Sequence, residues 1–142
     1  MVTLIEKAKK LKLIAAQGYN SVASRTTWQT FQALGEDPCA YGKITQMQAA
    51  FIVLYITDFV RDYFLYPWVG CALSPGCMVP SGDPYNYLEC VNGKNKHEFH
   101  LCHRFDQSVM NILMYRMFNK TVDEHILKFG LYKIERLGSN LV

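Results

Sequence analysis

The sequence lacks a long apolar run and an excess of charge of one sign. Its longest apolar stretch, residues 49–56, is far too short to cross a bilayer, and the first residues lack the apolar core of a signal peptide. We therefore expect membrane attachment only through a segment absent from this chain. The net charge is +3, and the one basic cluster, residues 7–12, lies beside apolar residues at helical spacing. This pattern predicts an amphipathic helix over residues 1–19 with a solvated lysine face, and no nucleic-acid partner.

Several motifs of catalysis are also missing. No glycine-rich phosphate loop occurs, and Ser108 is not part of a Gly-x-Ser-x-Gly elbow, so a hydrolase is disfavoured. A group of four potential zinc ligands comprises His97, His100, Cys102 and His103. Its spacing matches no standard zinc finger or catalytic zinc site, so we expect no metal centre and keep zinc as the less favoured alternative.

What the sequence contains is typical of one folded α/β domain. Half of the 142 residues are hydrophobic, and helical and strand patterns alternate along the chain. We expect a mixed sheet with flanking helices. The expected elements are an opening helix ending near Gly18, a helix capped by Thr26 or Thr27, a central strand over 48–56, a helix that starts at Thr57-Asp58 with a kink at Pro67, and a closing strand over 131–135.

The five cysteines favour an oxidising compartment. Cys71 is close to Cys77 in sequence, and Cys90 is close to Cys102, in segments rich in proline, glycine and asparagine where short disulfide loops are common. Two such disulfides would staple the long irregular segment that follows residue 73. Cys39 is left over, and five reduced cysteines in a cytosolic protein remain the alternative. Asn119 opens an acceptor sequon for N-glycosylation, which also favours the secretory pathway.

The segment from His103 to Asn111 is the main candidate site. Asp106 is the expected N-cap of a helix that runs to about Phe118, and Gln107 and Asn111 lie one turn apart on it. An N-cap carboxylate is commonly structural. That explanation accounts for Asp106 alone, and leaves the two amides and the preceding His103 unexplained. From the residues alone, structure and function are therefore both open.

These residues belong to a block that resembles a known family. The block consists of Trp-Val-Gly-Cys-Ala-Leu at 68–73, Cys-Met-Val-Pro-Ser-Gly at 77–82, Cys90, and Cys-His-Arg-Phe-Asp-Gln-Ser at 102–108. The family has Trp-Val-x-Cys-Ala-Leu, Cys-Ile-x-Pro-x-Gly and Cys-His-Arg-Tyr-Asp-Gln-Ser in the same order. This order is similar to the C-terminal part of the GT-A-like glycosyltransferase domains of an uncharacterised animal family that is expanded in nematodes. The resemblance covers roughly residues 20–138, and it supports both disulfides.

The resemblance implies a partial GT-A-like fold over residues 20–142 and a sugar-side site. By it, Asp106 and Gln107 would be catalytic and lie beside the donor sugar, Asn111 would support them, and His103 or Arg104 would face the diphosphate. The partners would be a nucleotide sugar and a glycan or protein acceptor, in the Golgi, the ER lumen or outside the cell.

Two departures from the family limit this expectation. No Asp-x-Asp metal motif occurs in these 142 residues, and the nucleotide-binding half is absent. We therefore expect no cofactor in this chain, with manganese needed only if the other half were present. The expectation is a truncated or inactive glycosyltransferase-like protein. The alternatives are a non-catalytic binding module of the secretory pathway and an incomplete gene product.

Overall fold

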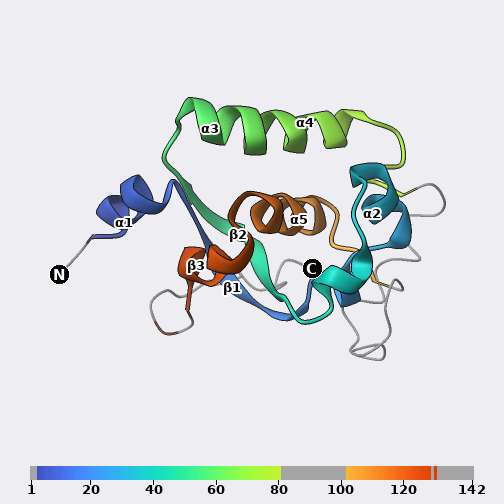
Figure 1. The fold of residues 1–142 in the computed structure, drawn as a ribbon, viewed down its shortest axis with the longest axis horizontal. Coiled ribbons are helices and arrows are strands. Elements are labelled where there is room, and N and C mark those ends of the chain that lie inside the picture. The colour runs from blue at the N-terminus through green and yellow to red at the C-terminus, as the bar shows by residue number, and fades with distance from the viewer. Residues whose placement is uncertain (1–2, 81–101, 129, 131–142) are drawn as a thin grey trace, which may run out of the picture.

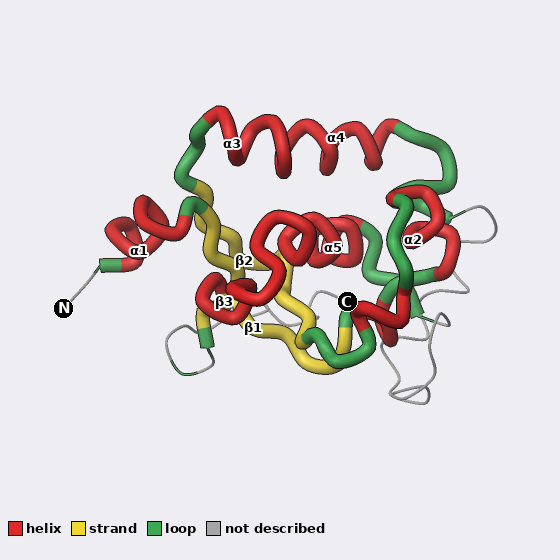
Figure 2. Tube along the Cα trace, viewed as in Figure 1, coloured by secondary structure: helices red, strands yellow, loops and turns green. Residues whose placement is uncertain are grey.

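The architecture is a small mixed sheet covered by helices (Figures 1 and 2). A computed structural model describes residues 3–80, 102–128 and 130. In chain order the elements are α1 (Leu4–Leu11), β1 (Leu13–Ser21), η1 (Ala23–Arg25), α2 (Trp28–Leu34), η2 (Pro38–Tyr41), β2 (Thr45–Leu54), α3 (Asp58–Val60), η3 (Arg61–Leu65), α4 (Tyr66–Leu73), α5 (Asp106–Phe118), η5 (Asn119–His125) and β3 (Ile126–Leu127). No helix in these ranges is long and apolar enough to span a bilayer.

The sheet has the strand order β2-β1-β3. β1 pairs antiparallel with β2 and parallel with β3, which confirms the expected mixed sheet. The run predicted to be a central strand forms β2, but β2 lies at an edge of the described sheet and is only partly buried. The central position belongs to β1, whose residues 13–16 are completely buried.

The opening helix is shorter than predicted. Thr3 and Glu6 form a capping box at its start. The helix ends at Leu11 rather than near Gly18. Lys12 takes a φ of 74°, a conformation that breaks the helix. The next four residues are buried on both sides as strand β1, because the gain from burying them in the sheet exceeds their helical preference.

Gly18 lies within β1 and does not end a helix. A Cβ atom at this position would lie 2.6 Å from the backbone oxygen of Gln46 on the neighbouring strand. The glycine is therefore required for a close approach of two backbones. The sequence prediction gave Gly18 a role at a helix end, whereas the glycine instead permits a close contact between two strands.

β2 is interrupted by a bulge. Ala15 of β1 pairs with Ile52, whereas the next residue, Ala16, pairs with Gln48. The three residues 49–51 therefore have no partner in β1. Ala49 and Ala50 lie in this interruption, whose amide groups need hydrogen-bond partners outside the sheet.

The helical segment 58–73 forms an outer layer of the molecule (Figure 1). Thr57 caps it as predicted, since the Thr57 side chain accepts a hydrogen bond from the Val60 N–H. The N–H of Tyr66 donates to Arg61 O, five residues earlier, in a π-helical turn. Pro67 then lies in the first turn of α4, where its missing N–H is tolerated. The segment 58–73 continues through Pro67 as one helix (Figure 1), so the predicted kink is not observed there.

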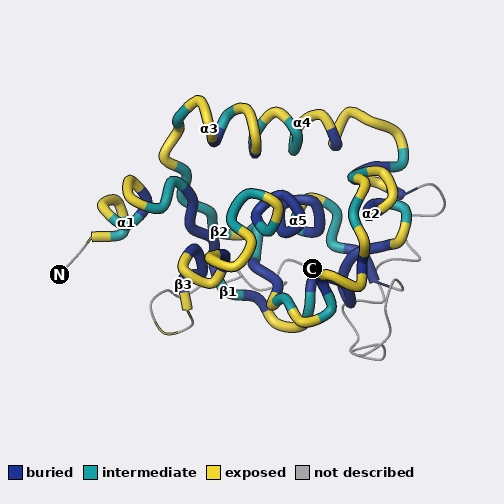
Figure 3. Tube along the Cα trace, viewed as in Figure 1, coloured by how far each residue is buried: buried dark blue, intermediate teal, exposed yellow. Residues whose placement is uncertain are grey.

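Helix α5 is the centre of the fold. It lies between the outer helical layer and the sheet, and packs against α4, η3, β2 and η5 (Figure 3). Seven consecutive residues, 108–114, are buried. The predicted helix to about Phe118 is confirmed. The predicted closing strand at 131–135 lies outside the described residues, and the last strand within them is β3.

Candidate functional site

The first turn of α5 differs from the prediction. Asp106 is the first helical residue and not the N-cap; Phe105 occupies the N-cap position with a φ of 43° and makes no side-chain cap bond. The turn is closed instead by Ser108, whose hydroxyl oxygen accepts a hydrogen bond from the Arg104 N–H at 3.1 Å. The Asp106 side chain is therefore not used for capping, and the residue is exposed.

The two amides of the motif hold the edge of the sheet. The Asn111 side chain accepts a hydrogen bond from the Met47 N–H at 2.6 Å and donates to Met47 O at 2.9 Å. It also donates to Gln107 O at 2.7 Å. The Gln107 side chain accepts from the Ala49 N–H at 3.3 Å, within the bulge of β2. Asn111 and Met47 are both completely buried.

This arrangement follows from matching repeats. Four residues of helix advance by about 6 Å, and two residues of strand by about 6.6 Å. Gln107 and Asn111, four apart on α5, therefore meet Ala49 and Met47, two apart on β2. The amides thus occupy backbone groups that an edge strand otherwise leaves unpaired. The spacing of Gln107 and Asn111 is therefore explained by the structural contacts that these two amides make with β2.

His103 is a buried connector. Its Nδ1 accepts from the Thr27 N–H at 3.3 Å, and its Nε2 lies 2.9 Å from Met78 O. A backbone N–H only donates and a carbonyl only accepts, so the ring is neutral with its proton on Nε2. Burial lowers the pKa of His103, although the Met78 carbonyl and Asp106 act in the opposite direction. Both ring nitrogens are occupied within the protein.

A buried polar cluster surrounds this histidine. Ser108 donates to Arg25 O at 2.7 Å, and Arg25 Nη1 donates to Cys102 Sγ at 2.9 Å. Burial lowers the pKa of Arg25, and the neighbouring Arg104 lowers it further. Thr30 donates to Cys77 O at 2.8 Å. The cluster thus joins the segment 25–30, the turn after α4 and the start of α5.

Sequence reasoning missed the role of segment 25–30. The segment is polar in sequence, yet Arg25, Thr26, Thr27 and Thr30 are all buried. The side chains of Arg25 and Thr30 and the N–H of Thr27 bind partners more than 40 residues away along the chain, so no local pattern predicts these contacts. The prediction of a helix capped by Thr26 or Thr27 is confirmed in position only, because Thr27 is the N-cap residue of α2 but its side chain makes no capping hydrogen bond.

The side of the motif that reaches solvent includes Asp106 and Arg104. Asp106 is exposed and Arg104 is half-buried. Trp68 of α4 donates from its indole Nε1 to Asp106 O at 3.1 Å, so an aromatic ring lies beside this turn. A carboxylate here accepts hydrogen bonds from hydroxyl groups, and its position in the first turn is favourable for its charge.

The cysteines agree with the sequence expectation where the structure describes them. Cys71 and Cys77 form a disulfide with an S–S distance of 2.02 Å. Cys39 is an exposed free thiol. Cys90, the expected partner of Cys102, lies outside the described residues, as do His97 and His100. Asn119, the expected glycosylation site, is exposed just after α5.

The described residues do not fit a metal centre. Within the ranges 3–80 and 102–128, no group of three or more histidine, cysteine, aspartate or glutamate side chains is placed to hold an ion. The manganese expected for a complete GT-A enzyme has no set of protein ligands in this part of the chain.

Comparison of the chain with protein-family models, with curated proteins and with solved structures gives no significant match.

Proposed function

We propose that this chain is a glycosyltransferase-like protein that contacts a sugar through Asp106 and does not transfer it on its own. One observation carries the proposal. Of the five predicted site residues, His103, Gln107 and Asn111 bind backbone groups of the protein, whereas Asp106 is exposed on the first turn of α5. The motif residues therefore divide into two groups. His103, Gln107 and Asn111 support the fold, and Asp106 faces outward.

The supporting residues hold the first turn of α5, and with it Asp106, in a fixed position. The amides attach α5 to β2, and Ser108 and His103 attach its start to segment 25–30. A site on such a rigid base is pre-organised, which lowers the cost of ordering it on binding. Asp106 would accept a hydrogen bond from a sugar hydroxyl, and the neighbouring Arg104 would attract a phosphate of the donor.

An oxidising compartment is part of the same proposal. The Cys71–Cys77 disulfide closes the turn that carries Met78, the partner of His103. Disulfides persist in the secretory pathway and outside the cell and are rare in the cytosol. We therefore place the protein in the Golgi or ER lumen or outside the cell.

Calorimetric titration with nucleotide sugars and with their free monosaccharides, with and without manganese, tests the proposal. We expect weak binding by the wild type, loss of binding in Asp106→Asn, and unchanged binding in the control Asp123→Asn, an exposed acid in η5. The same samples are assayed for hydrolysis of the donor. Turnover would contradict the inactive assignment, and absence of binding to every donor and sugar would contradict the glycosyltransferase-like one.

A further inference from the structure

The chain turns sharply at Asn119, directly after α5. This residue takes a φ of 43° and a ψ of −116°, a conformation that glycine and asparagine adopt more readily than other residues. Its N–H donates to Tyr115 O, which closes the last turn of the helix. The turn therefore explains a glycine at this position at least as well as an asparagine, because glycine has no Cβ atom to strain.

The side-chain amide of Asn119 takes no part in this turn. Among the residues that the structure describes, the amide makes no hydrogen bond, and the residue is exposed. Lys120 and Thr121, which follow it, are exposed as well. The Thr121 hydroxyl donates to Phe118 O at 2.7 Å and so satisfies a carbonyl at the end of α5. The fold thus uses the hydroxyl of Thr121 and leaves the amide of Asn119 without a structural role.

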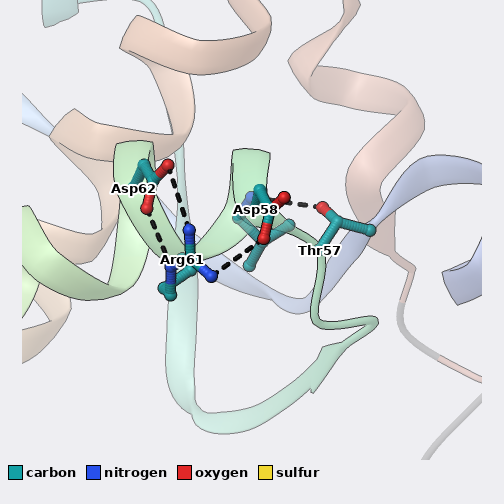
Figure 4. A network of polar contacts seen from close by, with 5 residues as sticks. Thr57, Asp58, Arg61 and Asp62 are labelled. Carbon is teal, nitrogen blue, oxygen red and sulfur yellow. Dashed lines mark hydrogen bonds and ion pairs between the residues drawn. The ribbon is translucent and has the colours of Figure 1, made fainter.

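The charged groups of the neighbouring helical segment are paired among themselves. Phe59 of α3 lies beside the end of α5, with its ring centroid 6.4 Å from that of Phe118. On the same segment, Arg61 pairs with Asp58 at 2.8 Å and with Asp62 at 2.9 Å (Figure 4). These charges therefore do not cover the Asn119 amide, which stays open to a group attached from outside.

The turn is held in place by the residues that follow it. Val122 is buried, and the ring of His125 stacks on Phe118 with a centroid distance of 3.6 Å. Nδ1 of His125 donates to Leu13 O at 2.8 Å, since a carbonyl only accepts. Asn119 is thus presented to solvent on an anchored turn. A bulky group attached to it would extend into solvent without displacing the core.

We propose that Asn119 carries an N-linked oligosaccharide. Asn119-Lys120-Thr121 has the form Asn-x-Ser/Thr, in which x is not proline, and it is the one such triplet in the 142 residues. The proposal rests on the secretory compartment proposed above, where the transferase that makes this modification is found.

The modification forms one bond and breaks one. The co-reactant is an oligosaccharide carried on a lipid diphosphate. Nδ2 of Asn119 forms a bond to the anomeric carbon of this oligosaccharide, and the bond from that carbon to the diphosphate oxygen breaks. The lipid diphosphate leaves with the bonding electrons, and one proton of the amide is released through the transferase. No group is oxidised or reduced.

The glycan and the Asp106 turn lie at opposite ends of α5. The helix has 13 residues, from Asp106 to Phe118, and at about 1.5 Å per residue it separates the two ends by roughly 20 Å. A glycan at Asn119 therefore leaves the carboxylate of Asp106 accessible. The two proposals can fail independently of each other.

Expression of the full chain in animal cells behind a cleavable secretory leader tests the proposal. The leader supplies entry into the ER, so the result depends neither on the natural compartment of the protein nor on sugar binding by Asp106. We expect the chain recovered from the medium to migrate as one slower band, which peptide N-glycosidase returns to the mobility of the unmodified chain. Peptide mapping after this treatment should find an aspartate in place of Asn119.

Single substitutions provide the controls. Asn119→Gln and Thr121→Val should abolish the slower band, and Thr121→Ser should retain it. Asn119→Gly should lose the glycan and keep the melting temperature of the deglycosylated wild type, because the turn accepts glycine. In the Asn119→Gln background, Lys43→Asn forms a new triplet with the exposed Thr45 and reports that the chain meets the transferase. A wild-type chain that reaches the medium without a glycan, or an enzyme-sensitive band that persists in Asn119→Gln, would overturn the proposal.

Discussion

Replacing Asn111 by leucine tests the proposed structural role of the motif's amides. Leucine has a similar volume but removes both hydrogen bonds to Met47, whose N–H and C=O are then left without these partners. Met47 is completely buried, so water does not replace them. An unsatisfied buried backbone group costs roughly 1–3 kcal/mol, so two groups give roughly 2–6 kcal/mol.

Equilibrium unfolding in urea measures this loss. The transition is followed by tryptophan fluorescence and circular dichroism in non-reducing buffer, so that the disulfide remains intact. A total stability of about 5–15 kcal/mol is usual for a domain, so Asn111→Leu removes a substantial part of it. The melting temperature should fall by roughly 5–15 °C.

Gln107→Leu is the matched control. Gln107 and Ala49 are only half-buried, and their hydrogen bond is long, at 3.3 Å. Water can reach the Ala49 N–H, so we expect a loss of only about 0.5–1.5 kcal/mol. Equal losses in the two variants, or an Asn111→Leu variant within about 0.5 kcal/mol of the wild type, would refute the reasoning.

Three further predictions follow from single features of the structure. Burial lowers the pKa of His103 and of His125 below the ordinary value of 6.5, so both are neutral in the fold, and the unfolded chain binds more protons below pH 6.5. The urea concentration at the unfolding midpoint should therefore be steady above about pH 7 and fall as the pH drops below about 6.5. A midpoint that rises on acidification would contradict this prediction. Gly18→Ala should destabilise the protein by roughly 1–3 kcal/mol, because its Cβ meets Gln46 O, whereas Gly70→Ala in open space should not lower the melting temperature of the dilute protein. Peptide mapping by mass spectrometry should find Cys71 linked to Cys77 and Cys39 alkylated, and the Cys71→Ser/Cys77→Ser variant should lose about 2 kcal/mol of stability; a reduced Cys71 would argue against an oxidising compartment.

The helical layer and α5 could be predicted because their signals are local. The hydroxyl of Thr57 caps the 58–73 helical segment, and an apolar stretch sets the length of α5 to Phe118. Each of these effects acts within a few residues of the chain. The same holds for the Cys71–Cys77 loop, which joins residues six apart.

The order of strands in the sheet and the contacts of the site could not be predicted, because they depend on contacts between residues that are distant in the sequence. Leu13 to Ala16 continue the apolar spacing of the opening helix, yet they pair with β2 and β3 across the core. Asn111 is 64 residues from Met47, so its use as a partner for an edge strand has no local sign. The N-cap assignment of Asp106 was wrong for a related reason: Phe105 adopts a positive φ as the chain turns from the buried Cys102 and His103 into α5.

We propose that Asp106 faces a sugar while the amides of Gln107 and Asn111 hold α5 against β2. The indole N–H of Trp68 is a natural reporter, because it donates to Asp106 O, and the indole of Trp28 in α2 serves as an internal reference. The most direct measurement is a ¹H–¹⁵N NMR titration of the wild type with a nucleotide sugar. We expect a shift of the Trp68 indole signal and of the backbone amides of residues 104–107, with the Met47 amide unchanged. Shifts confined to other parts of the chain, or no shift at the Trp68 indole at saturating ligand, would contradict it.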